Sequence, residues 1–213
     1  MPRRQRDEER DWRATLFVWR GVLGVSETNC LTWDGVWEPT DTDALPDESA
    51  YASSENEFNL RTRMMGGDDL EILEGCLGRN GNNAEELFWG LEHLGDIKLT
   101  GSYQLDQGDG RGHQSYSDDW HDLVVSIRGP YAVVAACGET QFGRFVSLGY
   151  IDGHDMMLAR RYVADDDVRA AWRTPKDVLN GTDWGILEDG QESFDPEAVA
   201  VKLPWRVEPS KKR

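Results

Sequence analysis

The sequence predicts a mostly β fold: an antiparallel meander of about eight strands closed into a barrel, with one short helix and an extended C-terminal arm. Short segments of alternating apolar and polar residues follow one another between residues 12 and 163, as is typical of half-buried strands. Three of these segments contain a glycine, Gly35, Gly101 or Gly149, one or two residues before an aromatic side chain. Glycine lets a strand bulge or bend, so these positions favour a closed barrel over a flat sandwich.

The chain length allows one folded domain with a segment at each end. With 213 residues, a second full core is not expected, because domains typically span about 100–200 residues. Residues 1–11 are charged throughout and are predicted to form a polar leader. Residues 12–163 contain the alternating segments and are predicted to form the barrel domain. Residues 164–213 follow as the arm.

The first half of the barrel is predicted from three alternating segments. Strands are expected over residues 15–19, 31–38 and 58–64, and residues 69–74 allow a short fourth strand. The first strand is expected to end at the glycines of residues 21–24. Residues 39–57 contain no basic residue and are rich in Ser, Asp and Thr, which predicts a long surface loop.

One helix is predicted over residues 83–94. Leu87 and Leu91 recur at helical spacing. Asn83 is a candidate N-cap, because its side chain can accept a hydrogen bond from the first turn. Gly95 is expected to end the helix.

The second half of the barrel returns to alternation. Strands are predicted over residues 97–106 and 120–128, separated by the glycine-rich connection 107–112, and Gly129-Pro130 turns the chain. Residues 131–163 then predict three short strands joined by two tight connections. A short helical segment is possible over residues 168–172.

Composition limits the classes of partner. The chain carries 40 acidic and 23 basic residues, and its net charge is −17. This charge repels nucleic-acid backbones and anionic membrane surfaces, so neither is expected as a partner. A protein partner with a basic surface would be attracted. The sequence shows no secretory signal and no run of about 18 apolar residues, which predicts an intracellular, cytoplasmic protein.

The cysteines and the known sequence motifs give no sign of a metal centre or a cofactor. Cys30, Cys76 and Cys137 lie far apart and form no C-x-x-C pair, so neither a disulfide framework nor a zinc site is predicted. No phosphate-binding loop, dinucleotide fingerprint or nucleophile motif is found in a suitable context. We therefore expect no cofactor, and no signature supports an enzyme.

One group of histidines and aspartates precedes and begins the strand predicted over residues 120–128. It consists of His113, His121, Asp118, Asp119 and Asp122. These side chains are of the types that bind metals, but they lack the spacing of a known metal site. We expect them to be solvated loop residues.

The clearest candidates for ligand binding are Arg160 and Tyr162 in the last predicted strand. Residues two apart in a strand point the same way, and an arginine beside a tyrosine hydroxyl can bind a carboxylate through charge-assisted hydrogen bonds. This R-x-Y pattern resembles the carboxylate site on a late strand of the fatty-acid-binding proteins, within the lipocalin-like (calycin) group. The resemblance implies a lipocalin-like barrel with both side chains pointing inward. The alternative is that Arg160 faces solvent, and apolar residues on both faces of this strand leave the choice open.

Tryptophans supply the remaining candidate contacts. Trp33 and Trp37 share one face of a strand, where they form either a stacking platform for a ligand or part of the core. Trp172, Trp184 and Trp205 lie in the polar arm, although disordered tails are normally poor in aromatic residues. They are therefore predicted to anchor the arm on the barrel or on a partner.

Two functions are compatible with these features. The first is a non-catalytic protein-interaction module, or an accessory subunit of a larger assembly, whose arm binds a protein partner. The second is a lipocalin-like binder of a small apolar ligand whose carboxylate is held by Arg160 and Tyr162. An open barrel interior would favour the second function. An interior filled by Trp33, Trp37 and Tyr103 would favour the first.

Overall fold

The computed structural model describes residues 15–40, 45–77, 84–107, 110–128 and 131–182. Several predicted features lie outside these residues: the leader over residues 1–11, the helix cap at Asn83, the Gly129-Pro130 turn, and Trp184 and Trp205 of the arm. None of the helices within the described ranges is long and apolar enough to cross a membrane.

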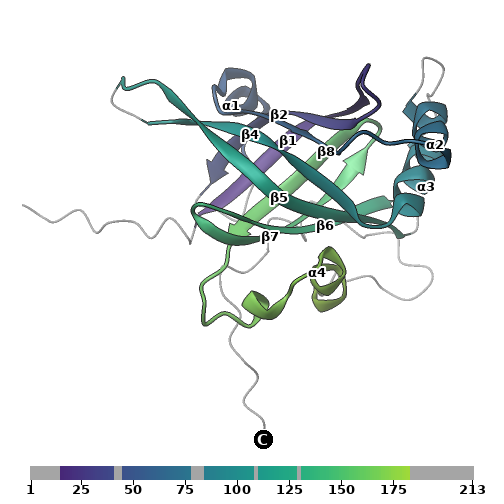
Figure 1. Ribbon diagram of the computed structural model, residues 1–213. Helices are drawn as coiled ribbons and strands as arrows, with labels where there is room; N and C mark the ends of the chain where they lie inside the picture. Colours follow the sequence, from purple (N-terminus) through teal and green to yellow (C-terminus); the bar gives the residue numbers. More distant parts are fainter. Residues whose placement is uncertain (1–14, 41–44, 78–83, 108–109, 129–130, 183–213) are drawn as a thin grey trace, which may run out of the picture.

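Eight antiparallel strands form a closed barrel (Figure 1). Each strand pairs with the next in sequence, and β8 pairs with β1 to close the sheet. The strands are β1 (Leu16–Val25), β2 (Leu31–Thr40), β3 (Glu57–Arg61), β4 (Ile97–Asp106), β5 (His113–Arg128), β6 (Tyr131–Thr140), β7 (Gly143–Asp152) and β8 (Asp155–Tyr162). The predicted meander barrel is confirmed, and its closure gives every strand two neighbours.

Glycines lie where neighbouring backbones approach most closely. At Gly35, Gly101 and Gly149, a β-carbon would overlap a carbonyl group of the adjacent strand. Gly35 pairs with Gly21 of β1, so two strands approach at a position where neither has a side chain. For this reason β1 continues through its glycines, and the prediction that the first strand ends at residues 21–24 is wrong.

Among the described residues, three helices lie in the connections between strands: α1 (Glu48–Ser53), α2 (Asp68–Leu77) and α3 (Ala84–Leu94). α3 confirms the helix predicted over residues 83–94. α1 lies within the segment predicted as a loop, where the Asp47 carboxylate caps its first turn. The short strand predicted over residues 69–74 is wrong. That segment forms α2 because its buried residues, Leu73 and Cys76, lie three apart, on one face of a helix.

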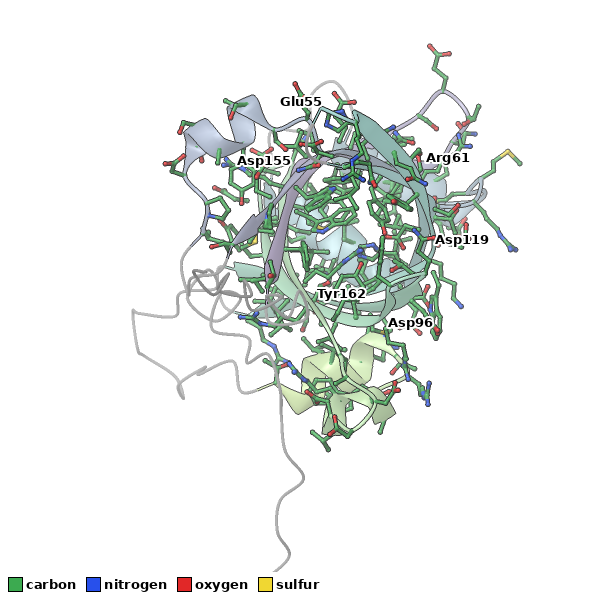
Figure 2. The ribbon with its side chains drawn as sticks, turned by 90° about the vertical axis from the view of Figure 1, so that its left-hand side faces the viewer. Glu55, Arg61, Asp96, Asp119, Asp155 and Tyr162 are labelled. Carbon is green, nitrogen blue, oxygen red and sulfur yellow. The ribbon has the colours of Figure 1, made fainter. Side chains whose placement is uncertain are left out.

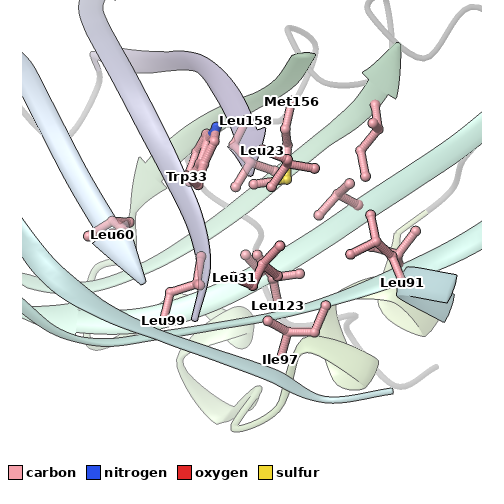
Figure 3. Packing of buried hydrophobic residues seen from close by; sticks show 14 of the residues in the cluster. Leu23, Leu31, Trp33, Leu60, Leu91, Ile97, Leu99, Leu123, Met156 and Leu158 are labelled. Carbon is pink, nitrogen blue, oxygen red and sulfur yellow. The ribbon is translucent and has the colours of Figure 1, made fainter. Parts of the chain in front are cut away.

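Helices α2 and α3 cover one end of the barrel, which we call the closed end (Figure 1). Leu73 of α2 and Leu91 of α3 belong to the same buried cluster as Leu31 and Leu123 inside the barrel, and Figure 3 shows this packing around Leu91. The closed end is therefore filled with aliphatic side chains. We call the opposite end, where the β4–β5 and β6–β7 hairpins turn, the open end.

A second apolar cluster lies on the outer face of the barrel. η2 (Val168–Ala171) and α4 (Pro175–Gly181) follow β8, and Figure 1 shows α4 beneath the strands. Val178 of α4 is fully buried in a cluster with Val133 and Leu148. The described part of the arm therefore packs on its own barrel. One face of β8 points into the barrel and the other lies in this outer cluster.

Candidate functional site

A cavity of about 310 Å³ lies inside the barrel at the open end. Figure 2 looks into the barrel from this end. The wall is mostly aromatic and consists of Phe17, Trp19, Trp37, Tyr103, Leu105, Phe142, Arg160 and Tyr162. The interior is filled toward the closed end and hollow toward the open end. Trp37 and Tyr103 stand in the wall of the cavity and do not plug it.

Arg160 points into the barrel from β8. Leu158, two residues earlier, belongs to the interior cluster, so the alternation of the strand brings Arg160 and Tyr162 to the same side. The guanidinium lies between two rings, with its Cζ atom 4.0 Å from the centre of the Trp19 ring and 3.7 Å from that of Phe145. Only 1% of the residue is exposed. The alternative in which Arg160 faces solvent is therefore wrong.

A β-bulge in β5 turns two polar side chains toward Arg160. Residues three apart in a regular strand point to opposite faces, yet Asp118 and His121 are both buried inside. Between paired residues, β4 has only Thr100, whereas β5 has both Asp119 and Trp120. Such an extra residue re-aims the neighbouring side chains. The expectation that Asp118 and His121 are solvated loop residues is wrong, because β5 begins well before the predicted strand.

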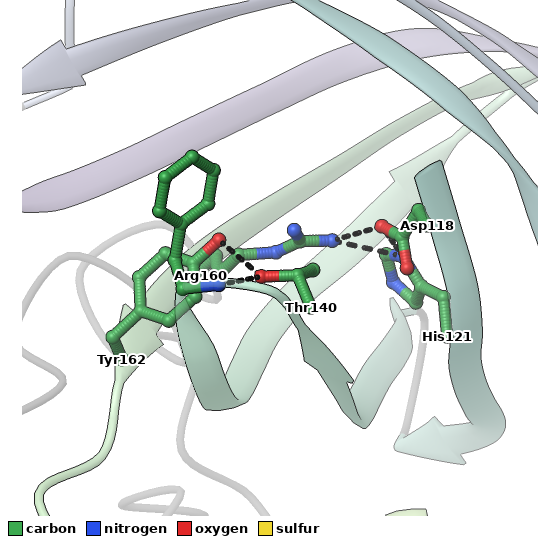
Figure 4. A network of polar contacts seen from close by, with 6 residues as sticks. Asp118, His121, Thr140, Arg160 and Tyr162 are labelled. Carbon is green, nitrogen blue, oxygen red and sulfur yellow. Dashed lines mark hydrogen bonds and ion pairs between the residues drawn. The ribbon is translucent and has the colours of Figure 1, made fainter. Parts of the chain in front are cut away.

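Arg160, Asp118 and His121 form a buried polar network (Figure 4). Nη2 of Arg160 donates to Oδ2 of Asp118 at 2.9 Å and lies 2.9 Å from Nδ1 of His121. A guanidinium has no acceptor, so Nδ1 accepts this second bond and the neutral imidazole carries its proton on Nε2. The 3.2 Å contact between Nδ1 of His121 and Oδ2 of Asp118 becomes a hydrogen bond only when the imidazole is protonated.

The network contains one positive and one negative charge. Burial raises the pKa of Asp118, but Arg160 and His121 beside it lower this pKa more, and it ends below its usual range. Burial lowers the pKa of His121, and the neighbouring Asp118 carboxylate does not offset this effect. At neutral pH, Asp118 is therefore ionised and His121 is neutral. The charges of Arg160 and Asp118 balance.

Several hydrogen-bond donors in this region have no acceptor. In the described part of the chain, Nε and Nη1 of Arg160 and Nε1 of Trp19 are buried and make no hydrogen bond. Buried polar groups without a partner are uncommon, and each costs about 1–3 kcal/mol. Arg160 and Trp19 both line the cavity, so a bound molecule that reached these donors and accepted from them would remove that cost.

Tyr162 and Trp37 lie with Arg160 in the cavity wall, whereas Trp33 lies elsewhere in the core. The Tyr162 hydroxyl is 3.3 Å from Oγ1 of Thr140. Nε1 of Trp37 donates to a backbone carbonyl of β4 at 3.1 Å, which fixes the ring in the wall. Trp33 is fully buried in the interior cluster and is not part of the wall. Three of the four candidate ligand contacts therefore meet at the cavity.

Trp172, a candidate partner contact, lies outside the barrel. It is partly buried against the outer cluster, and its ring fills the space in front of Gly181. Nη2 of Arg144 donates to its carbonyl oxygen at 2.7 Å, which ties the segment to β7. Trp172 therefore contacts its own chain, and a partner-binding role for it stays a prediction.

Within the described residues, no three histidine, cysteine or carboxylate side chains gather closely enough to hold a metal ion. His113 lies at the open end, where its Nε2 atom is 3.3 Å from Oε2 of Glu55, whereas His121 is inside the barrel. These two histidines do not converge. The three cysteines are free and buried. Burial raises the pKa of Cys137 to about 12, which keeps this thiol protonated and unreactive.

Acidification is expected to destabilise the protein through His121. The pKa of His121 is lower in the folded state than the unfolded value of about 6.5. As the pH falls below that value, the unfolded state binds a proton that the folded state does not. The free energy of unfolding should therefore fall by up to about 1.4 kcal/mol per pH unit between the two pKa values.

Substitution of His121 by asparagine, His121→Asn, tests this pH dependence. Asparagine keeps an acceptor near the Nδ1 position but does not titrate, so the variant should lose this part of the slope. Urea unfolding between about pH 7 and about pH 5 measures the difference. His113→Asn removes a histidine from the rim and serves as the control. Parallel curves for the wild type and His121→Asn would contradict a neutral buried imidazole.

The fold and the cavity define an antiparallel meander barrel with an internal pocket. Comparison of the chain with known protein families, curated proteins and solved structures finds no match. A barrel of this kind hosts many unrelated functions, so the fold alone does not assign one. What the protein binds must be inferred from the cavity and the groups that face it.

Proposed function

We propose that the protein binds a small, largely apolar molecule inside the open end of its barrel. The observation that best supports this proposal is an aromatic cavity of about 310 Å³ with Arg160 in its wall. Among the described residues, Nε and Nη1 of that side chain have no acceptor. Small-molecule pockets combine a concave apolar wall with a few placed polar groups.

The size and shape of the cavity limit the ligand. Small-molecule pockets span about 300–1,000 Å³, and this one lies at the lower end of that range. A compact molecule with about one or two rings fits such a volume better than a long acyl chain. Trp19, Trp37 and Tyr103 provide ring faces for a flat ligand. Lipocalins use eight-stranded barrels to hold one small ligand, and the proposal includes such a calycin-like use.

The second function, a protein-interaction module or accessory subunit, stays a prediction. Two of its anchors, Trp184 and Trp205, lie outside the described residues, and the third, Trp172, packs on its own barrel. The net charge of −17 fits a basic partner. An intracellular, cytoplasmic location is likewise a prediction that goes with either function.

Native mass spectrometry of protein purified gently from its own cells distinguishes the two functions. A small retained mass would support the proposal, and it should be absent from a variant whose cavity is filled. A stoichiometric protein partner without a small mass would favour the interaction module.

Filling the cavity is expected to block binding with little loss of stability. Leu105 lines the cavity and is only partly buried, so Leu105→Trp can occupy the hollow without removing core atoms. Affinity for an uncharged naphthalene ketone, followed by its emission shift, should fall at least about tenfold, which corresponds to about 1.4 kcal/mol. Trp89→Ala changes a tryptophan that is 60% exposed on α3, and it should leave affinity unchanged. Equal affinity in the wild type and Leu105→Trp would contradict the proposal.

A further inference from the structure

We infer that the ligand is uncharged and carries a carbonyl-type hydrogen-bond acceptor, and that Asp118 sets this preference. The inference rests on the proposed function, because it concerns the occupant of the same cavity. The inferred ligand differs from the carboxylate-bearing ligand that the R-x-Y pattern predicts. The reason is that Asp118 already places a buried negative charge beside Arg160.

The charge of Arg160 is already balanced inside the protein. Its Nη2 donates to Oδ2 of Asp118 at 2.9 Å, and both side chains are almost completely buried. His121 contacts the same pair as a neutral acceptor. A ligand carboxylate would add a second negative charge and leave the site with a net charge. Burial of an unbalanced charge is strongly unfavourable, whereas a carbonyl group brings none.

Two residues of the cavity wall, Arg160 and Trp19, carry buried N–H donors, and the hydroxyls of Tyr103 and Tyr162 in the same wall can donate or accept. Nε and Nη1 of Arg160 and Nε1 of Trp19 have no acceptor among the described residues. Oδ1 of Asp118 also lacks a partner there, but Asp118 is not part of the wall. A carbonyl oxygen has two lone pairs and can accept from a guanidinium. A protonated amine has no acceptor for these N–H groups and would add a second positive charge beside Arg160.

The charges at the open end also disfavour an anion. Glu55, Glu57 and Asp106 are exposed at this end of the strands, and Figure 2 labels Glu55 beside the mouth. The basic residue Arg111 also lies at this end, on the β4–β5 hairpin, close in sequence to the acidic Asp106. Both Nη groups of Arg144 donate to backbone carbonyls of the segment after β8. The net charge of −17 adds to this field, which repels an approaching carboxylate.

Asp118 acts on the ligand through Arg160 and is therefore a positioning residue. Its carboxylate accepts from Nη2, whereas Nε and Nη1 have no acceptor among the described residues, and it cancels the charge of the guanidinium. Without that carboxylate, Arg160 would be an unbalanced cation in an apolar wall and would favour an anion. The charge preference of the cavity therefore depends on a residue that does not line it.

A pair of ligands with one body and different charge tests the inference. The full chain is titrated with naphthalene carboxamide and with naphthalene carboxylate, and the two affinities are compared. The wild type is expected to bind the carboxamide at least about tenfold more tightly. Asp118→Asn keeps the size of the side chain and removes its charge, so it should shift this ratio toward the carboxylate. Asp119→Asn removes a charge from the exposed neighbouring position and should leave the ratio unchanged.

Each outcome of this experiment bears on the inference or on the proposed function. Tighter binding of the carboxylate by the wild type would overturn the inference and leave the proposed function standing. An unchanged ratio in a folded Asp118→Asn would also overturn it. If unfolding curves show that this variant does not fold, the wild-type ratio decides alone. Binding of neither probe, together with no small mass retained in native mass spectrometry, would remove the proposed function itself.

Discussion

Replacing Asp118 by alanine is expected to lower the free energy of unfolding by about 3–5 kcal/mol. The substitution removes the carboxylate that accepts from Nη2 of Arg160. The guanidinium would remain buried between Trp19 and Phe145 with no opposite charge beside it. Removal of one partner of a buried ion pair is costly because the other charge cannot return to water. Urea unfolding curves measure the loss.

Two further variants separate the lost charge balance from the lost side chain. The double variant Asp118→Ala/Arg160→Met removes both charges and should recover most of the stability, since apolar replacement of a buried pair is often neutral. Asp119→Ala alters the exposed neighbour on the bulge and should change the free energy of unfolding by less than about 0.5 kcal/mol. Equal losses in the single and double variants would show that the packing of Asp118 matters and its charge does not.

Most of the barrel can be predicted from the local sequence pattern. A half-buried strand shows alternating apolar and polar residues whichever strands it pairs with. β4 (Ile97–Asp106) matches its prediction at both ends. α2 is not predictable in the same way, since Leu70 and Ile72 alternate like strand residues. Only the burial of Leu73 and Cys76 at the closed end selects the helix, and that contact depends on the whole fold.

The candidate site is predictable only in part. Arg160 and Tyr162 can be found as neighbours on one strand face, but their inward direction cannot, because the segment after β8 makes the other face apolar as well. Asp118 and His121 are missed because a spacing of three assigns them to opposite faces of a regular strand. The bulge that unites them is a property of the register between β4 and β5, and nothing in the local sequence marks it.

The role of the C-terminal arm depends on how firmly its first part is held. Arg144 donates to the carbonyl oxygens of Ala170 and Trp172 at 2.6 and 2.7 Å, and Asp167 pairs with Arg169 at 2.7 Å in a buried position. These contacts stabilise η2 and bring α4 against the outer face. If they hold the segment as firmly as a core element, α4 is not available to a partner.

Replacing Val178 by aspartate is therefore expected to lower the free energy of unfolding by more than about 4 kcal/mol. Val178 is fully buried in the outer cluster with Val133 and Leu148, so the carboxylate of Val178→Asp would lose its contact with water among apolar side chains. Urea unfolding, followed by the far-UV signal of the strands, measures the effect on the barrel itself. Asn180→Asp places the same charge on an exposed position of α4 and should cost less than about 0.5 kcal/mol.

The outcome decides between the two uses of the arm. A large loss for Val178→Asp would show that α4 is part of the barrel's core, and deletion of residues 174–213 should then destabilise the strands as well. A loss no larger than that of Asn180→Asp would show that α4 docks weakly. The segment would then be free to bury Val178 and Trp172 on another protein, and the interaction-module hypothesis would regain support at the expense of a purely internal role for the arm.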